Sequence, residues 1–227
     1  LALARPELDV LGITTVAGNV GLDATTRNAL GVLALAGRGD IPVAAGADRP
    51  LVRPLRTASQ VHGTSGLEGA DLPAPIAPLR PEGAVELMAR LIRESPVPVT
   101  LVPTGPLTNI ALFLGAHPAL RDRIERICLM GGSMGEGNWT ASAEFNIWVD
   151  PDAAARVFDA GIPVTQVTID VMHQALVPVA VSDGWAAIGN RTGRVFADLF
   201  RFFAGWHARR YGWDGSPIHD AVAVAHL

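Results

Sequence analysis

Residues 128–152 read CLMGGSMGEGNWTASAEFNIWVDPD, and this stretch indicates how the rest of the chain is organised. A short apolar run, Arg126 to Met130, ends in Gly131-Gly132, and a loop rich in Gly, Asn, Ser and Thr follows. Asp150-Pro151-Asp152 then begins a helical pattern. The stretch therefore predicts a strand, a long polar loop and a helix, in that order.

The polar side chains of this loop are candidate ligand-binding groups. Asn138, Glu144 and Asn146 stand among three aromatic residues close to the end of the predicted strand. An amide both donates and accepts hydrogen bonds, so one carboxylate and two amides suit a small polar ligand that carries several hydroxyls. The alternative is a long surface loop in which Asn and Gly residues only form turns.

Working outward, strands and helices alternate along the chain. Strands are predicted at 9–16, 41–45, 99–103, 124–130 and 164–169, and helices at 22–36, 81–94, from 107, at 151–160 and over much of the chain after 182. Residues 49–79 are rich in Pro and Gly and form a long excursion. This alternation predicts an α/β fold with a mainly parallel open sheet flanked by helices, of Rossmann-like topology.

Ligands of such sheets bind beyond the carboxyl ends of the strands. Asn19, Thr104, the loop residues 138–146 and Asp170 all follow predicted strands. No GxGxxG motif follows the first strand, so a nucleotide-binding Rossmann domain is not supported.

Composition narrows the classes of partner. The chain has 227 residues, a net charge of −4 and no basic run, which argues against nucleic acid and membrane surfaces as partners. Cys128 is the only cysteine and lies in an apolar run, so we expect a core residue in a reducing compartment, the cytoplasm. The first and last residues lack helix-capping signals, so we expect one domain, 1–227, incomplete at both ends.

Several motifs occur together in a fixed order. They are VAGN at 16–19, VHGTSGL at 61–67, PTGPLTNIA at 103–111, LMGG at 129–132, GNWTASAEFNIWVDPDAA at 137–154 and HDAVAV at 219–224. This set resembles the inosine-uridine-preferring nucleoside hydrolases and covers nearly the whole chain. The resemblance implies a mainly parallel α/β sheet and hydrolysis of the N-glycosidic bond of ribonucleosides, small-molecule substrates, by a homodimer or homotetramer.

The resemblance also implies a role for individual residues. Those implied to bind the substrate are Asn19, His62, Asn138, Glu144 and Asn146. Asp220 and the backbone carbonyl of Thr104 are implied ligands of Ca²⁺, and His219 is the implied proton donor to the leaving base.

These residue types suit the chemistry. Cleavage of a ribosyl C–N bond builds oxocarbenium character on the sugar and negative charge on the base. Oxygen acceptors around the sugar favour that positive charge. A hard cation binds oxygen ligands and vicinal hydroxyls, and an imidazole can protonate the departing base.

Each residue also has a structural alternative. Asp220 could complement a helix dipole, Asn19 could be a left-handed turn residue after Gly18, and His62 could belong to a turn. Thr104 could simply precede a helix. The remaining histidines are interpreted as structural or solvated, and the aromatic residues of 196–206 as core or a subunit contact.

The chain departs from the family pattern in one respect. Nucleoside hydrolases carry an aspartate-rich motif, DTDxGxDD, which supplies most of the Ca²⁺ ligands and should lie just before Leu1. The sequence does not contain it, so the residues present are short of metal ligands. Three hypotheses follow: a Ca²⁺-dependent hydrolase whose motif precedes Leu1, a non-catalytic nucleoside- or ribose-binding protein or inactive remnant, and a structural domain that binds nothing.

Overall fold

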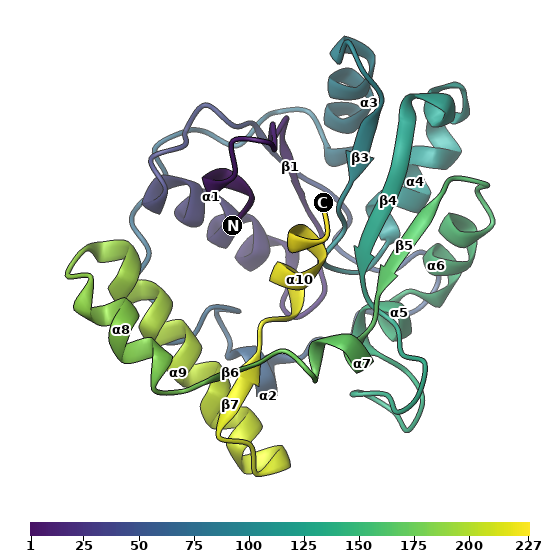
Figure 1. Cartoon of the computed structure of the whole chain (residues 1–227). Helices are drawn as coiled ribbons and strands as arrows, with labels where there is room; N and C mark the ends of the chain where they lie inside the picture. Colours follow the sequence, from purple (N-terminus) through teal and green to yellow (C-terminus); the bar gives the residue numbers. More distant parts are fainter.

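The computed structural model describes residues 1–227, and Figure 1 shows its strands and helices. The strands are β1 (Ile13–Thr15), β2 (Val43–Ala45), β3 (Val99–Leu101), β4 (Ile124–Met130), β5 (Val164–Val167), β6 (Leu176–Pro178) and β7 (Gly215–Pro217). The helices are α1 (Leu22–Leu35), α2 (Ser59–His62), α3 (Ala84–Glu94), α4 (Thr108–Ala116), α5 (Phe145–Val149), α6 (Pro151–Phe158), α7 (Ile169–Met172), α8 (Val181–Ala187), α9 (Arg191–Tyr211) and α10 (His219–Ala225). Two 3₁₀ turns, Ala2–Ala4 and Pro118–Arg123, complete the set.

The predicted parallel pairing is confirmed. β1 pairs with β2, and β3, β4 and β5 form a three-stranded sheet, all in parallel. The two parallel sheets share no ladder with each other. A third pair, β6 with β7, is antiparallel and was not predicted, because both strands have only three residues and β7 contains a glycine and a proline, which are rare in strands.

β4 organises the core because its side chains alternate between two buried faces. Ile127 and Leu129 pack into a cluster with residues of α3, α4 and α6. Cys128 and Met130 face the opposite way, toward Met172 and residues of α10. Both faces of the sheet are therefore covered by helices, as expected, and Cys128 is the core residue that its apolar neighbours predicted.

Several predicted boundaries were wrong by a few residues. The helix expected from Pro81 begins at Ala84, because Gly83 is extended and forms the N-cap. The strand expected to reach Ile169 ends at Val167, and residues 169–172 turn into α7. Asp170 consequently lies in the first turn of a helix and not at the tip of a strand.

Residues 176–217 lie outside the parallel sheets. α8 and α9 make a hairpin on one side of the molecule, with β6 and β7 between it and α10 (Figure 1). No helix combines the length and the apolar character needed to cross a lipid bilayer.

Candidate active site

The segments that follow β3 and β4 meet at one buried amide. The Asn146 Nδ2 group donates to the carbonyl oxygens of Met130 at 3.1 Å and Thr104 at 3.4 Å, and it lies 3.0 Å from the Met130 sulfur. The structure thus brings together Thr104 and Asn146, two residues expected at the site. Met130, the last residue of β4, was not predicted, because its contribution comes from a carbonyl and a thioether that carry no motif.

Glu144 stands beside this amide and is only 2% exposed. Its carboxylate caps α5 by accepting from the N–H groups of Asn146 at 2.9 Å and Ile147 at 3.2 Å, and it accepts from Gly132 at 2.9 Å. Burial raises the pKa of Glu144, while these N–H groups act in the opposite direction. We call Thr104, Met130, Glu144 and Asn146 the amide site.

Gly132 allows the chain to turn into the loop at this point. Its φ of 76° lies in the left-handed region that favours glycine. A Cβ atom there would lie 1.9 Å from the Gln166 side-chain nitrogen, which itself donates to the Gly131 carbonyl.

Asn138 lies in the loop after β4, and Asn19 follows β1. The Asn138 Oδ1 atom accepts from the Phe145 N–H at 2.9 Å, so its oxygen already fastens the loop. The Asn19 carbonyl accepts from the Ala58 N–H at 2.9 Å. No residue other than glycine has a positive φ, so Asn19 is not a left-handed turn residue.

Asp220 lies in the first turn of α10, and Ala223 of that helix packs against β4. Its side chain reaches solvent, yet protein surrounds it closely enough that loss of hydration, followed by the nearby charge of Glu144, raises its pKa to about 7. The helix-dipole alternative for Asp220 remains compatible with this position, since the residue does lie at a helix N-terminus.

His219 precedes Asp220 and meets a group of rings. Its imidazole lies 5.8 Å from Phe203 and 6.0 Å from His207, measured between ring centroids. His62, at the end of α2, stacks on Phe203 at 5.4 Å with an interplanar angle of 25°. We call His62, Phe203, His207 and His219 the ring cluster. It brings together two residues expected at the site from segments more than 150 positions apart.

Burial governs the charge of these imidazoles. It lowers the pKa of His219 to about 3 and that of His62 to about 4, and neighbouring imidazoles act in the same direction. Both rings are therefore neutral near pH 7, and each keeps one N–H as a hydrogen-bond donor.

His207 and Phe203 complete the ring cluster, and neither was proposed as a site residue from the sequence. His207 is 3% exposed, and its Nδ1 atom lies 3.1 Å from both the Ser216 hydroxyl and the Phe203 carbonyl. Phe203 was assigned to the core or to a subunit contact, yet it touches both site histidines. The spacing of 203 and 207, one helical turn, was the available signal.

Two further polar residues of the motifs, Asn109 and Asp150, tie segments of the fold together. Asn109 of the TGPLTN motif accepts from the Ala47 N–H and donates to the Thr15 carbonyl, both at 2.9 Å, and so ties α4 to the ends of β1 and β2. Asp150 is fully buried and accepts from Thr108, Leu51 and Ala153.

The donors expected for a metal are few. No three carboxylate, imidazole or thiol groups come close enough together to hold an ion. Asp220 and the Thr104 carbonyl offer oxygen, the ligand that Ca²⁺ prefers, but a calcium ion takes about six to eight such ligands. The donor type fits calcium, and the number of donors falls short.

The whole chain, residues 1–227, matches the family model described as inosine-uridine preferring nucleoside hydrolase. The chain belongs to this family. It is 51% identical to the pyrimidine-specific ribonucleoside hydrolase RihA of Citrobacter koseri, over 100% of this chain and 73% of that protein. The RihA of Salmonella arizonae is 52% identical over the same shares.

Solved structures of nucleoside hydrolases share the fold. The purine-preferring ribonucleoside hydrolase from Gardnerella vaginalis superimposes with a TM-score of 0.94 at 32% identity, over 99% of this chain and 73% of that one. A plant nucleoside hydrolase, PpNRh1, gives a TM-score of 0.93 at 32% identity, over 99% and 71% of the two chains. The nucleoside hydrolase family and the parallel α/β fold expected from the sequence are confirmed.

Proposed function

We propose that this protein hydrolyses the N-glycosidic bond of ribonucleosides to ribose and free base, and that it prefers pyrimidine bases. Family membership supports the reaction and favours it over non-catalytic ribose binding. The base preference rests on the 51% identity to pyrimidine-specific RihA proteins, compared with 32% to the purine-preferring hydrolase.

One observation carries the assignment of the sugar side. The Asn146 amide joins the Thr104 carbonyl to the end of β4, directly beside the buried Glu144 carboxylate. In the proposed reaction, Glu144 and Asn146 hold ribose hydroxyls, with Asn138 and Asn19 at the rim. Oxygen acceptors fixed in a buried place cost no rearrangement when positive charge develops on the sugar ring.

We assign binding of the nucleobase to the ring cluster. His62, His207 and His219 all lie beside Phe203, and His62 and His219 are the two implied to contact the substrate. His219 acts in its protonated form, a minor species near pH 7: the imidazolium gives its proton to the base as negative charge develops there, and the ring returns to the neutral imidazole. The low pKa of its imidazolium makes that group a strong acid once formed.

Calcium is the proposed cofactor. Asp220 and the Thr104 carbonyl would hold part of its shell. When bound, Ca²⁺ supplies a water of lowered pKa and a contact for two vicinal hydroxyls.

We propose a cytoplasmic homodimer or homotetramer. Phe196 on α9 is 51% exposed and would suit a subunit contact.

Ribose release from uridine and inosine tests the function. We expect faster release from uridine, loss of release on treatment with a calcium chelator, and recovery when calcium is restored. Asn146→Ala should lower kcat/KM by about 100-fold or more, because the amide acts on the transition state. An enzyme preparation that releases no ribose from any nucleoside, with or without added calcium, would refute the proposal.

A further inference from the structure

The loop that leaves β4 continues to follow its neighbour beyond the end of the strand. The Gly131 N–H donates to the Val167 carbonyl at 3.0 Å, and the Ile169 N–H donates to the Gly132 carbonyl at 3.1 Å. The pairing of β4 with β5 therefore extends two residues into the loop that carries Asn138.

Beyond the end of this pairing, the Asp170 side chain holds the loop. Its two carboxylate oxygens accept from the N–H groups of Met134 at 2.8 Å and Gly135 at 3.0 Å. The Met134 N–H is the main reason that the pKa of Asp170 lies below its usual value. A Cβ atom at Gly135 would lie 3.2 Å from the carboxylate, so glycine permits this close approach.

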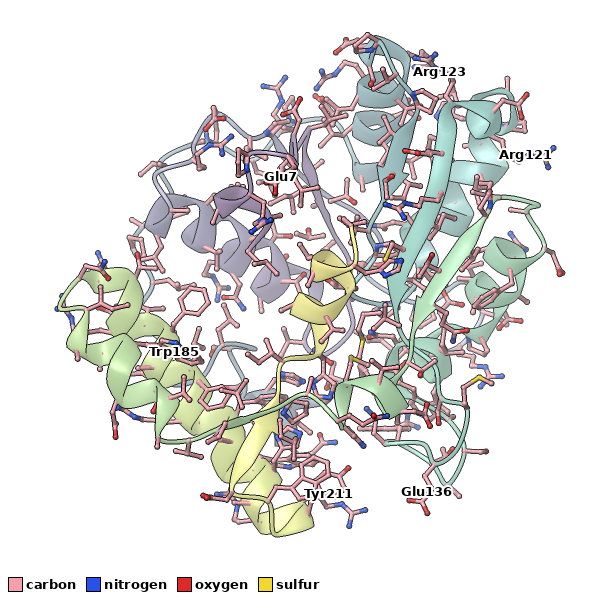
Figure 2. The ribbon with its side chains drawn as sticks, in the orientation of Figure 1. Glu7, Arg121, Arg123, Glu136, Trp185 and Tyr211 are labelled. Carbon is pink, nitrogen blue, oxygen red and sulfur yellow. The ribbon has the colours of Figure 1, made fainter.

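The two halves of the loop are held differently. In the distal half, Trp139 donates to the Ala143 carbonyl and packs on Phe145 at 4.9 Å, so that half supports itself. In the proximal half, residues 133–136, the Asp170 carboxylate supplies the contacts to the rest of the fold, beside one internal bond from Ser133 to the Glu136 carbonyl. Figure 2 shows Glu136 on this loop, at the periphery of the molecule.

Asp170 also lies near His173, three residues further along the chain. Its charge acts on His173, and the His173 ring meets His219 at 6.3 Å between centroids. His173 thus connects the surroundings of Asp170 to the ring cluster.

We infer that Asp170 is a positioning residue for ribonucleoside binding: its carboxylate holds residues 133–136, and through them the loop bearing Asn138, in the arrangement that receives the sugar. This inference rests on the proposed function. Without the contacts to Asp170, the loop would adopt its binding-competent arrangement in only a fraction of the molecules. The apparent affinity for the ribonucleoside would fall in proportion to that fraction.

The test compares Asp170→Asn with Asp152→Asn in the otherwise unchanged protein. Both aspartates lie in the first turn of a helix, but Asp152 has only a 3.9 Å contact with Arg53 at the surface. For Asp170→Asn we expect KM for uridine to rise about tenfold with kcat within about twofold of wild type. Asp152→Asn should match wild type. Asp170→Glu, which keeps the carboxylate, should recover part of the affinity.

Two readouts do not depend on turnover. Hydrogen exchange should show protected Met134 and Gly135 amides in the wild type and faster exchange in Asp170→Asn. Calorimetric titration with ribose should show weaker binding by the variant. If the wild-type protein releases no ribose from nucleosides, the proposed function is refuted. The comparison of ribose affinity between wild type and Asp170→Asn would still test the role of Asp170.

An Asp170→Asn protein with wild-type KM and ribose affinity overturns the inference, even where exchange at the two amides has changed. Should that variant not fold, the wild-type protein decides: rapid exchange of the Met134 and Gly135 amides overturns the inference, and slow exchange supports it.

Discussion

The amide site and the ring cluster are two halves of one candidate site, and they are built in different ways. The amide site is held by hydrogen bonds to backbone groups, and Glu144 alone accepts from three N–H groups within 12 residues along the chain. The ring cluster is held by packing of side chains from α2, α9 and α10. Geometry in the first half is set by local chain turns, and in the second by how distant helices meet.

This difference predicts where each half is vulnerable. A hydrogen-bonded carboxylate that is removed leaves buried donors without partners, which costs stability as well as activity. A ring that is removed from a packed group leaves the backbone satisfied, so activity should suffer more than folding.

The largest expected effect is that of Glu144→Ala. Three backbone N–H groups lose their acceptor, and we expect the free energy of unfolding in urea to fall by about 3 kcal/mol. Ribose release should fall by about 100-fold or more. Glu136→Ala is the matched control, because Glu136 is an exposed glutamate of the same loop. A loss of stability equal to that of the control would contradict the structural role given to Glu144.

His219→Ala should act on the leaving group and little on folding. We expect kcat for uridine to fall by about 10²–10⁴, because proton transfer to the base is lost. With p-nitrophenyl riboside, whose leaving group departs without a proton, the fall should be at least tenfold smaller. His226→Ala, an exposed histidine of the same segment, is the control. Equal losses on both substrates would remove His219 from the role of proton donor.

The smallest effect should come from His62→Gln and concerns pH. In the folded protein the pKa of His62 is about 4, below its ordinary value of 6.5. Between these values the unfolded chain binds more protons, so stability rises with pH and is lost as pH falls from 6.5 toward 4.

The glutamine variant should therefore flatten the pH dependence of the unfolding free energy by about 1 kcal/mol for each pH unit in that window. Parallel curves of unfolding free energy against pH for variant and wild type would show that His62 is not buried as described.

The sequence predicted the amide site better than the ring cluster for a physical reason. Glu144 and Asn146 lie in one short segment after a strand, where local pattern and parallel-sheet geometry both constrain them. The contacts of Phe203 could not be predicted, because a ring on one helix gives no sign of which distant segment will meet it. The antiparallel pairing of β6 with β7 was equally hidden, since both strands have only three residues and β7 contains a glycine and a proline.

Asn138 and Asp170 show a second limit of the sequence. Both were recognised as polar groups beyond strand ends. The side-chain oxygens of both accept hydrogen bonds from backbone N–H groups of the segment 134–145. A motif marks which polar side chains matter at such an edge, but it does not distinguish the side chain that meets a ligand from the one that shapes the loop around it.

The long helix α9 packs chiefly against α8 and β7, outside the parallel sheet. If the proposed function holds, substitutions along its inner face would alter the shape offered to a base without changing the hydrogen bonds of the amide site. Such independence would let one scaffold diverge toward different nucleosides over evolutionary time, by drift in a single hairpin.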